Sequence, residues 1–394
     1  MTAITDIVIL SGRRTAVGTF GGALAGQPPI ALAATAARAA IADSGLAPEA
    51  IGSSVWGHVI NTEPRDMYLS RVAAMEAGVP ETTPAMNVNR LCGSGLQAIV
   101  SAAQALMLGD ADTALAGGAE CMSRSPHALP ARWGTKMGDA RAMDMMLGAL
   151  NCPFGTGHMG VTAENVAAEH GVSREDQDAF ALESQRRAAA AIEAGRFERE
   201  IAPVEIASRR STTLFQRDEH PKATTAEALA GLKPVFRKDG SVTAGNASGI
   251  NDGAAALVLA TAEAADRAGA APRARLLGYA HAGVRPEVMG IGPVPAVEAL
   301  LARTGLSAGD FDVIESNEAF AAQAVAVNRA LGLDPAKVNP NGGAIALGHP
   351  VGATGAIIAV KALHELERTG GRRALCTMCI GGGQGIALAF ERIG

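Results

Sequence analysis

The feature of this sequence that most limits its fold is a repeated alternation between short apolar runs and Ala-rich runs of helical character. Strands are predicted over Asp6–Leu10, Ser54–Ile60 and Ala85–Asn89, because each is a short apolar run bounded by turn residues. Helices are predicted over Ile30–Ser44 and Leu96–Leu108, where apolar residues recur at spacings of three and four. Alternation of this kind predicts βαβ units, and therefore an α/β fold with a mostly parallel sheet buried by helices.

The length of the chain predicts more than one packed unit. At 394 residues it exceeds the size at which a single hydrophobic core keeps growing. The predicted units are 1–120 (completed by about 239–272), 121–238 and 273–394. The first and last are α/β halves, and the middle one is an inserted loop domain with Met-rich and polar stretches. Each half places a Gly-rich turn before an Ala-rich helix, once after Leu91 and once after Leu347, which hints at a duplicated unit.

Composition and charge exclude several classes of function. A net charge of -5, a pI near 5.9 and 3% aromatic residues provide no basic or ring-lined surface for nucleic acid. The N-terminus lacks the basic start and apolar stretch of an export signal, and no apolar run reaches membrane-spanning length. Five cysteines are too few and scattered for a disulfide framework. We therefore expect a soluble, cytoplasmic protein with reduced thiols, which acts on small molecules rather than on nucleic acid or membranes.

Cys92 stands where a predicted strand turns into a predicted helix, within Asn87–Gln97. At the N-terminus of a helix the backbone N–H groups are free and the dipole is positive, which lowers the pKa of a thiol and can hold an oxyanion. Gly93 and Gly95 permit a tight turn that a substrate can approach closely. The pattern predicts an activated nucleophile. The alternative is a small, buried core cysteine.

His349 lies in a Gly-rich segment, Asn341–Gly355, and histidine is the usual proton acceptor for a thiol nucleophile. The alternative is a loop histidine that is simply solvated or hydrogen-bonded. The segment lacks the Lys-Ser/Thr ending of a phosphate-binding P-loop, and no G-x-G-x-x-G fingerprint follows a strand here. Nucleotide binding of these two kinds is therefore disfavoured.

Cys376 and Cys379 form a C-x-x-C sequence in the segment Cys376–Gly385. A zinc site needs a second pair of ligands at suitable spacing, which the other cysteines do not supply, so no metal is expected. A redox C-x-x-C normally opens a helix, whereas this stretch is predicted to be a strand with the two side chains on opposite faces. Cys379 is instead predicted at the strand end, beside glycines whose N–H groups can donate.

The segment Glu315–Phe320 is predicted to be a strand end that runs into a helix. In open α/β sheets, ligands bind outside the carboxyl ends of the strands. The polar residues at this junction therefore indicate a site. The alternative is ordinary N-capping of the helix by Ser316 or Asn317.

These four segments, in this order and spacing, resemble the thiolase family. The motifs are N-x-x-C-G-S-G-L-Q-A around Cys92, N-E-A-F at Asn317, G-H-P at His349 and C-I-G-G-G-Q-G at Cys379. Within the family the chain is most similar to bacterial β-ketothiolases that act on short-chain substrates. The resemblance implies two similar α/β halves in a five-layered α-β-α-β-α arrangement, with the loop domain covering coenzyme A. It also implies a homo-oligomer, usually a dimer of dimers, with coenzyme A and acyl-CoA as substrates and no permanently bound cofactor.

The resemblance further implies an acyl-CoA C-acyltransferase that catalyses a ping-pong Claisen condensation or its reverse, CoA-dependent thiolysis. His349 would take the proton of Cys92, which would carry the acyl group. Cys379 would take a proton from the methyl carbon of a second acetyl-CoA. The resulting enolate oxygen would be held by His349 and a water on Asn317, and the tetrahedral intermediate by the N–H groups of Cys92 and Gly381.

Other positions match the residues that contact the coenzyme in the family. Those in the pantetheine channel would be His158, Met159, Ala244, Ser248 and Phe320. Met289 falls near the acyl pocket. Where relatives usually carry an arginine near the coenzyme phosphates, this chain reads Glu219–Ala223 and is one residue shorter. Lys222 is predicted to replace that arginine as a point charge, without its bidentate fork.

Three rival functions make different predictions. A decarboxylating ketoacyl synthase shares the fold and the nucleophilic cysteine, but it uses a second histidine where this chain has Cys379, and it requires a malonyl donor. A non-catalytic acyl-CoA or lipid carrier would leave Cys92 without selective reactivity toward iodoacetamide. A metal or redox protein using Cys376 and Cys379 would hold a metal or form a reversible disulfide.

Overall fold

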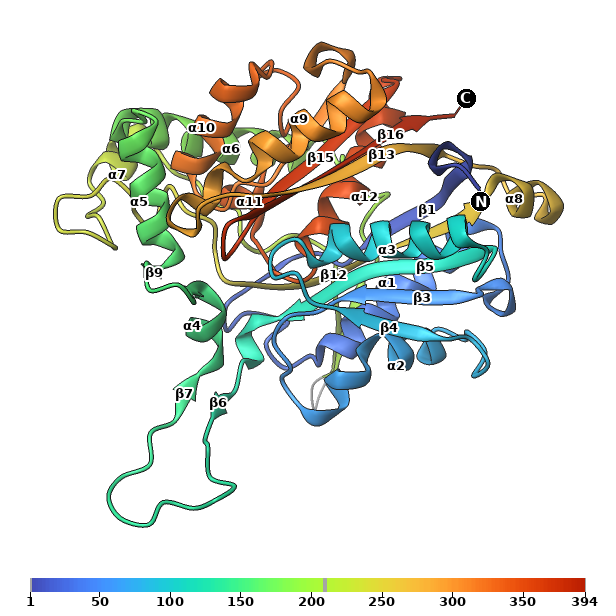
Figure 1. The fold of residues 1–394 in the computed structure, drawn as a ribbon, viewed down its shortest axis with the longest axis horizontal. Coiled ribbons are helices and arrows are strands. Elements are labelled where there is room, and N and C mark those ends of the chain that lie inside the picture. Colours follow the sequence, from blue (N-terminus) through green and yellow to red (C-terminus); the bar gives the residue numbers. More distant parts are fainter. Residues whose placement is uncertain (1, 208–210, 394) are drawn as a thin grey trace.

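The computed structural model describes residues 2–207 and 211–393. At its centre is a ten-stranded sheet in the order β14-β15-β16-β13-β1-β12-β5-β3-β4, with the short β2 paired to β12. Figure 1 shows that the early and late parts of the chain each supply one block of strands with helices packed on it. These two blocks are the halves of the fold.

The first half has its strands in the order β1-β12-β5-β3-β4. Its strands are β1 (Ile7–Arg14), β2 (Gly18–Thr19), β3 (Ser53–Gly57), β4 (Ala85–Val88), β5 (Thr113–Cys121) and β12 (Asn251–Thr261). Its helices are α1 (Pro29–Ser44), α2 (Leu69–Glu76), α3 (Ser94–Leu108) and α8 (Ala262–Ala268). The five elements predicted in this region are all present, with boundaries shifted by a few residues.

The second half has its strands in the order β13-β16-β15-β14, and Val338 extends the sheet through a parallel bridge to Ile314. Its strands are β13 (Ala274–Gly283), β14 (Val313–Ser316), β15 (Arg373–Ile380) and β16 (Gln384–Arg392). Its helices are α9 (Pro293–Thr304), α10 (Ala321–Leu331), α11 (Ala344–Leu347) and α12 (Thr354–Thr369).

The two halves have the same topology. Numbered along the chain, with the bridge at Val338 as the third strand of the second half, both read 1-5-4-2-3 across the sheet. In both, the pairs 1–5 and 5–4 are antiparallel, whereas 4–2 and 2–3 are parallel. The halves join where β1 pairs antiparallel with β13. The prediction of a mostly parallel sheet is therefore wrong, because an apolar run in a sequence does not reveal the direction of its strand.

Alternation along the strands gives each face of the sheet its own core. In β12 the even-numbered residues 254–260 pack with α1 and α2 on one outer face, whereas the odd-numbered residues 255–259 face the centre. In the second half, Leu375, Ala387 and Ala389 pack with α9 on the other outer face. Helices α3 and α12 lie between the halves (Figure 1). The result is the five-layered α-β-α-β-α arrangement that the family resemblance implied.

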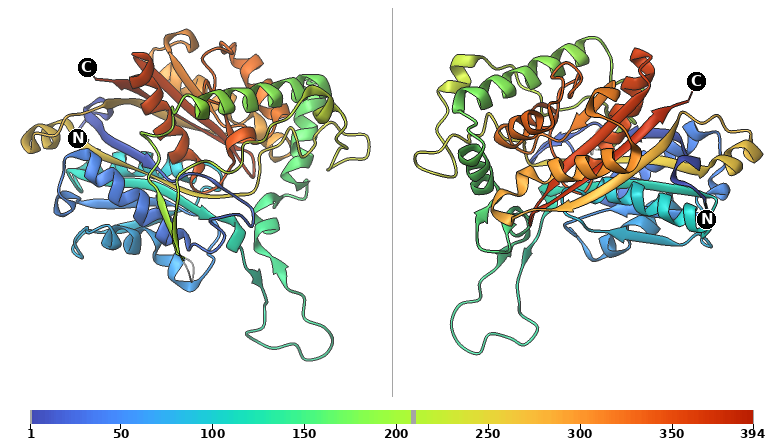
Figure 2. Two further views of the ribbon diagram at one scale, coloured as in Figure 1. Left: turned by 180° about the vertical axis from the view of Figure 1, so that it is seen from behind. Right: turned by 45° about the horizontal axis from the view of Figure 1, so that its top comes forward.

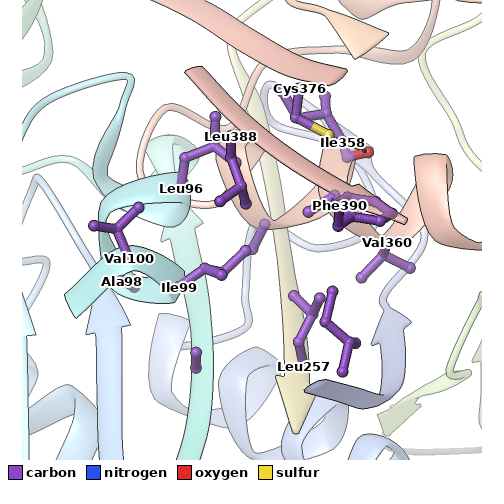
Figure 3. Packing of buried hydrophobic residues seen from close by; sticks show 14 of the residues in the cluster. Leu96, Ala98, Ile99, Val100, Leu257, Ile358, Val360, Cys376, Leu388 and Phe390 are labelled. Atoms are coloured by element: carbon purple, nitrogen blue, oxygen red, sulfur yellow. Dashed lines mark hydrogen bonds between the residues drawn. The ribbon is translucent and has the colours of Figure 1, made fainter. Parts of the chain in front are cut away.

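The central layer brings the N-terminal ends of α3 and α12 together. Figure 3 shows side chains of α3, α12, β12 and β16 gathered in this layer. Two glycines permit the close approach: a Cβ on Gly95 would lie 2.5 Å from Ala356 N, and one on Gly355 would lie 2.2 Å from Leu96 N. The turns that precede the two helices, which carry the predicted nucleophile and its histidine, are thereby held close to each other.

The segment Leu91–Leu108 is long and apolar enough to cross a membrane by length and composition alone, so the expectation that no apolar run reaches this length is wrong. It contains α3, however, and 56% of it is buried inside the protein. Packing in the central layer, between the two halves of the main sheet, accounts for its apolar character.

Between β5 and β12 the chain leaves the main sheet. The elements of this segment are β6 (His127–Ala128), β7 (Met143–Asp144), α4 (Met145–Leu150), β8 (Asn151–Cys152), β9 (Gly157–His158), α5 (Met159–Glu169), α6 (Arg174–Glu193), β10 (Val204–Ala207), β11 (Thr212–Phe215) and α7 (Ala226–Ala230). Helices α5 and α6 pack against α10 of the second half. The connection between β6 and β7 projects away from the other elements in all views (Figures 1 and 2). The boundaries of an inserted domain at 121–238 stay a prediction, and residues 208–210 within it lie outside the described residues.

Candidate active site

Cys92 lies in a strained turn between β4 and α3. Leu91, directly before it, has a φ of +45°, a left-handed conformation that costs a non-glycine residue roughly 1–2 kcal/mol. Two side chains hold this turn: Asn89 Oδ1 accepts from Leu91 N at 3.0 Å, and Ser94 Oγ donates to Leu91 O at 2.6 Å. The thiol of Cys92 is thus presented at the N-terminus of a helix, as predicted.

Burial raises the pKa of the Cys92 thiol to about 11. Two backbone N–H groups, those of Gly381 and of Cys92 itself, donate to the sulfur and oppose this rise, whereas the carboxylate of Glu120 adds to it. The expectation that the helix N-terminus lowers this pKa is therefore wrong, because removal of the thiol from water outweighs the N–H donors. At neutral pH Cys92 is a protonated thiol, and a base must take its proton before it can act as a nucleophile.

His349 is buried in the turn before α12, with 5% of its surface exposed. Its backbone N–H donates to Asn251 Oδ1 at 2.9 Å, and its Nδ1 lies 2.7 Å from Thr354 Oγ1. The Thr354 hydroxyl donates its one proton to Pro350 O at 2.9 Å, so Nδ1 carries the proton of the imidazole. Nε2 therefore has a free lone pair, and it has no partner among the described residues.

The environment of His349 keeps its ring neutral. Burial lowers the pKa of His349 to about 4. A neutral imidazole with Nε2 unprotonated can accept a proton at any pH near neutrality. His349 therefore has the protonation state that a base requires.

Cys379 is the penultimate residue of β15, and its surface is 1% exposed. Burial, and then the nearby Cys92, raise the pKa of its thiol well above the ordinary value. Cys376 packs in the central core and donates to Ile358 O, whereas Cys379 packs in a different cluster. The two cysteines therefore lie on opposite faces of the strand, as predicted.

Three of the predicted catalytic side chains, those of Cys92, His349 and Cys379, line one cavity of about 630 Å³. Residues from the turns before α3 and α12 and from the end of β15 thus meet at one place. The remaining predicted positions that line this cavity are His158, Met159, Lys222, Ala244, Ser248, Met289, Phe320 and Gly381. Residues 92, 349 and 379, which are far apart in the sequence, therefore share a single pocket.

One wall of this cavity is aromatic. His158 stacks on Phe236 with ring centroids 4.8 Å apart, and Phe236 meets Phe320 edge-on at 6.2 Å. His158 Nδ1 accepts from Gly160 N at 3.0 Å and caps α5. Such a lining, apolar with a few fixed polar groups, suits a slender organic ligand. No feature of the sequence pointed to Phe236.

Lys222 borders both this cavity and an adjoining cleft of about 850 Å³. Its backbone N–H donates to Gln185 Oε1 at 3.0 Å. Burial, and then the charge of Lys222, lower the pKa of the neighbouring His220 to about 4. An ammonium group is therefore available beside the junction of the two spaces.

Asn317 is the exception among the predicted catalytic residues, because it lines a separate chamber. It directly follows β14, is 2% exposed, and borders a space of about 20 Å³ together with Gly348 and Thr354. Its Oδ1 and Nδ2 both lack a partner among the described residues. A chamber of this size is large enough for about one water molecule.

Sequence reasoning missed the polar residues that hold these side chains in place. Thr354 and Asn251 bind His349, but nothing in the sequence distinguishes them from ordinary helix-start and strand residues. For Glu120 a signal was present, because it stands near the carboxyl end of β5, where the rule that pointed to Asn317 also applies. Within the described part of the chain, no group of three or more His, Cys, Asp or Glu side chains is arranged to hold a metal ion.

Sequence models of one family match nearly the whole chain. The model described as "Thiolase, N-terminal domain" matches residues 7–263, and "Thiolase, C-terminal domain" matches residues 270–392. Beta-ketothiolase BktB of Cupriavidus necator is 60% identical over 391 residues, which cover 98% of this chain and 99% of that protein. An acetyl-CoA acetyltransferase of Chromobacterium violaceum is 50% identical, over 98% of this chain and 100% of that protein.

Solved structures of similar proteins have the same fold. The acetyl-CoA acetyltransferase of Bacillus anthracis matches with a TM-score of 0.96 at 45% identity, over 100% of both chains. Human mitochondrial 3-ketoacyl-CoA thiolase in complex with CoA also matches with a TM-score of 0.96, at 43% identity, over 100% of this chain and 99% of that one.

Proposed function

The chain belongs to the thiolase family, and we propose that it is a β-ketothiolase. In this proposal Cys92 carries the acyl group, and Cys379 removes or returns the proton of the carbon that attacks in the condensation. As an acyl-CoA C-acyltransferase it joins acetyl-CoA to a second acetyl- or acyl-CoA. In reverse it cleaves a short-chain β-ketoacyl-CoA with CoA. The observation that carries the proposal is the single cavity shared by Cys92, Cys379 and His349, whose Nε2 has no partner in the described part of the chain.

In the first half-reaction Cys92 is acylated. Nε2 of His349 takes the proton of Cys92, whose sulfur attacks the thioester carbonyl carbon. The tetrahedral oxyanion is held by the N–H groups of Cys92 and Gly381, which already donate to the sulfur in the resting site. Removing one such donor typically costs about 3 kcal/mol of barrier. As the intermediate collapses, the CoA thiolate leaves with the proton of Cys379.

In the second half-reaction the Cys379 thiolate removes a proton from the methyl carbon of acetyl-CoA. Because burial and Cys92 raise the pKa of this thiol, its thiolate is a strong base, as C–H removal demands. The carbanion attacks the Cys92 thioester, the bond between the sulfur and the acyl carbon breaks, and protonated His349 returns a proton to Cys92. Each cysteine and the histidine then regain their starting protonation states.

The proton removal also puts charge on the oxygen of the second thioester. We assign its stabilisation to His349 and to a water bound by Asn317. Support comes from the unpartnered Oδ1 and Nδ2 of Asn317 beside a chamber large enough for about one water. His349 would then serve both half-reactions.

The coenzyme would lie along the aromatic wall. The pantetheine arm is mostly apolar and narrow, which fits a channel lined by the stacked His158 and Phe236, with Phe320 edge-on to them. Met159, Ala244 and Ser248 also line it. Lys222 is the predicted contact to the phosphates, because its ammonium borders the outer part of the same cavity.

The test is thiolysis of β-ketoacyl-CoA substrates of four to ten carbons with CoA, comparing the wild type with Cys379→Ser. We expect the wild type to cleave acetoacetyl-CoA and the variant to lose activity by on the order of a thousandfold, because general acid–base catalysis is removed. Cys379→Ser should still be acylated at Cys92 by labelled acetyl-CoA, although more slowly, since the attack uses His349 as base and only the departure of CoA uses the proton of Cys379.

Cys376→Ser is the matched control for this experiment, because Cys376 has the same residue type on the same strand but faces the central core. It should retain most of the thiolysis activity. Comparable thiolysis by the wild type and by Cys379→Ser would remove the acid–base assignment. Condensation that requires a malonyl donor would instead favour a decarboxylating synthase.

We also propose that the chain assembles as a homo-oligomer, a dimer of dimers. Trp133 and Met137 lie on the projecting connection between β6 and β7, and each is 91% exposed. Large apolar side chains on an extended loop are typical of a surface that another subunit covers. Sedimentation of the full chain measures the number of subunits, and a monomer at micromolar concentration would contradict this proposal.

A further inference from the structure

Glu120 is a buried carboxylate to which the reaction sequence above gives no role. It stands near the end of β5 and has 0% of its surface exposed. Three backbone N–H groups donate to it, those of Val59 and Gly352 to Oε2 at 3.1 and 3.0 Å, and that of Ile60 to Oε1 at 3.1 Å. A carboxylate that accepts three backbone hydrogen bonds is strongly fixed in position.

One oxygen of Glu120 connects the two turns of the active site. On one side, Oε2 binds Gly352, which lies in the turn that begins with His349. On the other side, Oε2 binds Val59 N, and the carbonyl of Val59 accepts from Asn89 Nδ2 at 3.4 Å. Asn89 Oδ1 in turn accepts from Leu91 N, in the turn that presents the nucleophile. Besides the packing of α3 on α12, Glu120 is therefore a second link between the segment of the base and the segment of the nucleophile.

The charged groups around Glu120 are few. His58 Nδ1 lies 3.4 Å from Glu120 Oε1 and 2.9 Å from Ala119 O, and His58 Nε2 lies 4.0 Å from Asp66 Oδ2. The turn of residues 350–352 offers Glu120 only backbone groups, and Cys92 is the ionisable group on the side of α3. The negative charge of Glu120 raises the pKa of Cys92. The carboxylate thus acts on the nucleophile through its field as well as through the backbone.

We propose that Glu120 is a positioning residue of this active site: it fixes the turn of the base relative to the turn of the nucleophile. This inference rests on the proposed function only for its effect on turnover. Its effect on the reactivity of Cys92 can be measured without any catalysis.

Two variants separate the bridge from the charge. Glu120→Gln retains an oxygen that can accept from Val59 and Gly352 but removes the negative charge, whereas Glu120→Ala removes both. For Glu120→Gln we measure how fast iodoacetamide alkylates Cys92 at different pH values, and we expect the midpoint of this pH dependence to move to lower pH. For each pH unit by which the midpoint falls, alkylation at pH 7 should become about tenfold faster. In Glu120→Ala we expect kcat for thiolysis to fall by about 10- to 100-fold with KM little changed, because the two turns lose their hydrogen-bonded link. Glu120→Gln keeps an acceptor for Val59 and Gly352 and should retain most of kcat.

Glu164→Gln is the matched control. Glu164 is also buried, at 5% exposure, and also accepts backbone N–H groups, from Ser241 and Val242, but it lies on α5. Its replacement should leave the pH profile of Cys92 alkylation unchanged while lowering the melting temperature to a similar extent. A folded Glu120→Ala protein with the wild-type kcat, or a Glu120→Gln protein that loses as much kcat as Glu120→Ala, would overturn the proposal. A wild-type protein without thiolysis activity would count against the proposed function instead, because the alkylation result would still stand.

Discussion

The two halves of the fold carry polar or reactive residues at equivalent positions but use them differently. One residue directly follows the second strand of each half, His58 after β3 and Asn317 after β14. Another stands second from the end of the fourth strand, Glu120 in β5 and Cys379 in β15. Because strand order and direction agree between the halves, these are two copies of the same pair of positions.

The difference between the pairs lies in their hydrogen bonds. In the first half Glu120 accepts three backbone hydrogen bonds, and His58 Nδ1 lies 2.9 Å from Ala119 O. In the second half the Oδ1 and Nδ2 atoms of Asn317 lack a partner among the described residues, and the thiol of Cys379 lines the cavity. The first pair therefore holds the backbone of the site. In the second pair Cys379 faces the cavity, and Asn317 has polar atoms available for a water in the chamber beside it. A duplicated unit thus supplies a supporting side and a reacting side.

The largest expected effect is the change with pH in the reactivity of the Cys92 thiol, compared with that of the Cys379 thiol on the reacting side. Because burial and Glu120 hold the pKa of Cys92 at about 11, its thiolate fraction should rise about tenfold for each pH unit from 7 to 10, or about a thousandfold in all. Cys379, which is more deeply buried and has a higher pKa, should remain unlabelled over this range. Timed labelling with iodoacetamide, followed by mass spectrometry, measures both cysteines. A plateau for Cys92 below pH 8 would mean that the helix N-terminus outweighs burial and Glu120.

A second, smaller effect concerns the equivalent positions Asn317 and His58, which directly follow the second strand of each half. Asn317→Ala should lower kcat for thiolysis by about a hundredfold, because it removes the predicted holder of the water that binds the enolate oxygen. His58→Asn, at the equivalent position of the first half, should lower kcat by less than about threefold and destabilise the fold by about 1–2 kcal/mol. Steady-state kinetics and denaturant unfolding distinguish these outcomes. Equal losses of kcat in both variants would show that the halves are not divided into a supporting and a reacting side.

The sequence predicted much of the candidate site because the necessary signals are local. The junction of a strand with a Gly-rich turn and a helix marks Cys92, and the equivalent Gly-rich turn marks His349. The positions around Cys379 and Asn317 are strand ends, which the rule for α/β sheets identifies as ligand sites. The family resemblance then joined these separate signals into one site. In the structure Cys92, His349 and Cys379 share one cavity, whereas Asn317 borders a separate chamber.

The remaining features depend on tertiary structure and could not be read from local patterns. The direction of β1, β12 and β16 follows from their partners across the sheet. The pKa of Cys92 was predicted in the wrong direction, because its value depends on burial and on Glu120, which lies far from it in sequence. The tautomer of His349 depends on where the proton of the Thr354 hydroxyl goes, which is a property of the folded turn.

This tautomer gives the smallest expected effect. Thr354→Val should lower the rate of Cys92 acylation by about tenfold, because the Nδ1–H of His349 loses its hydrogen-bond acceptor. The ring would then populate both neutral tautomers, and only the one protonated at Nδ1 has a basic Nε2 toward the cavity. Thr354→Ser keeps the hydroxyl and should restore the wild-type rate. Nitrogen-15 NMR of the histidine side chains reports the tautomer directly, and a merely structural defect would not change it. The proposal would be contradicted if Thr354→Val kept both the Nδ1–H tautomer and the wild-type acylation rate. Asn251 and burial alone would then orient the ring, and His349 would need no support from α12.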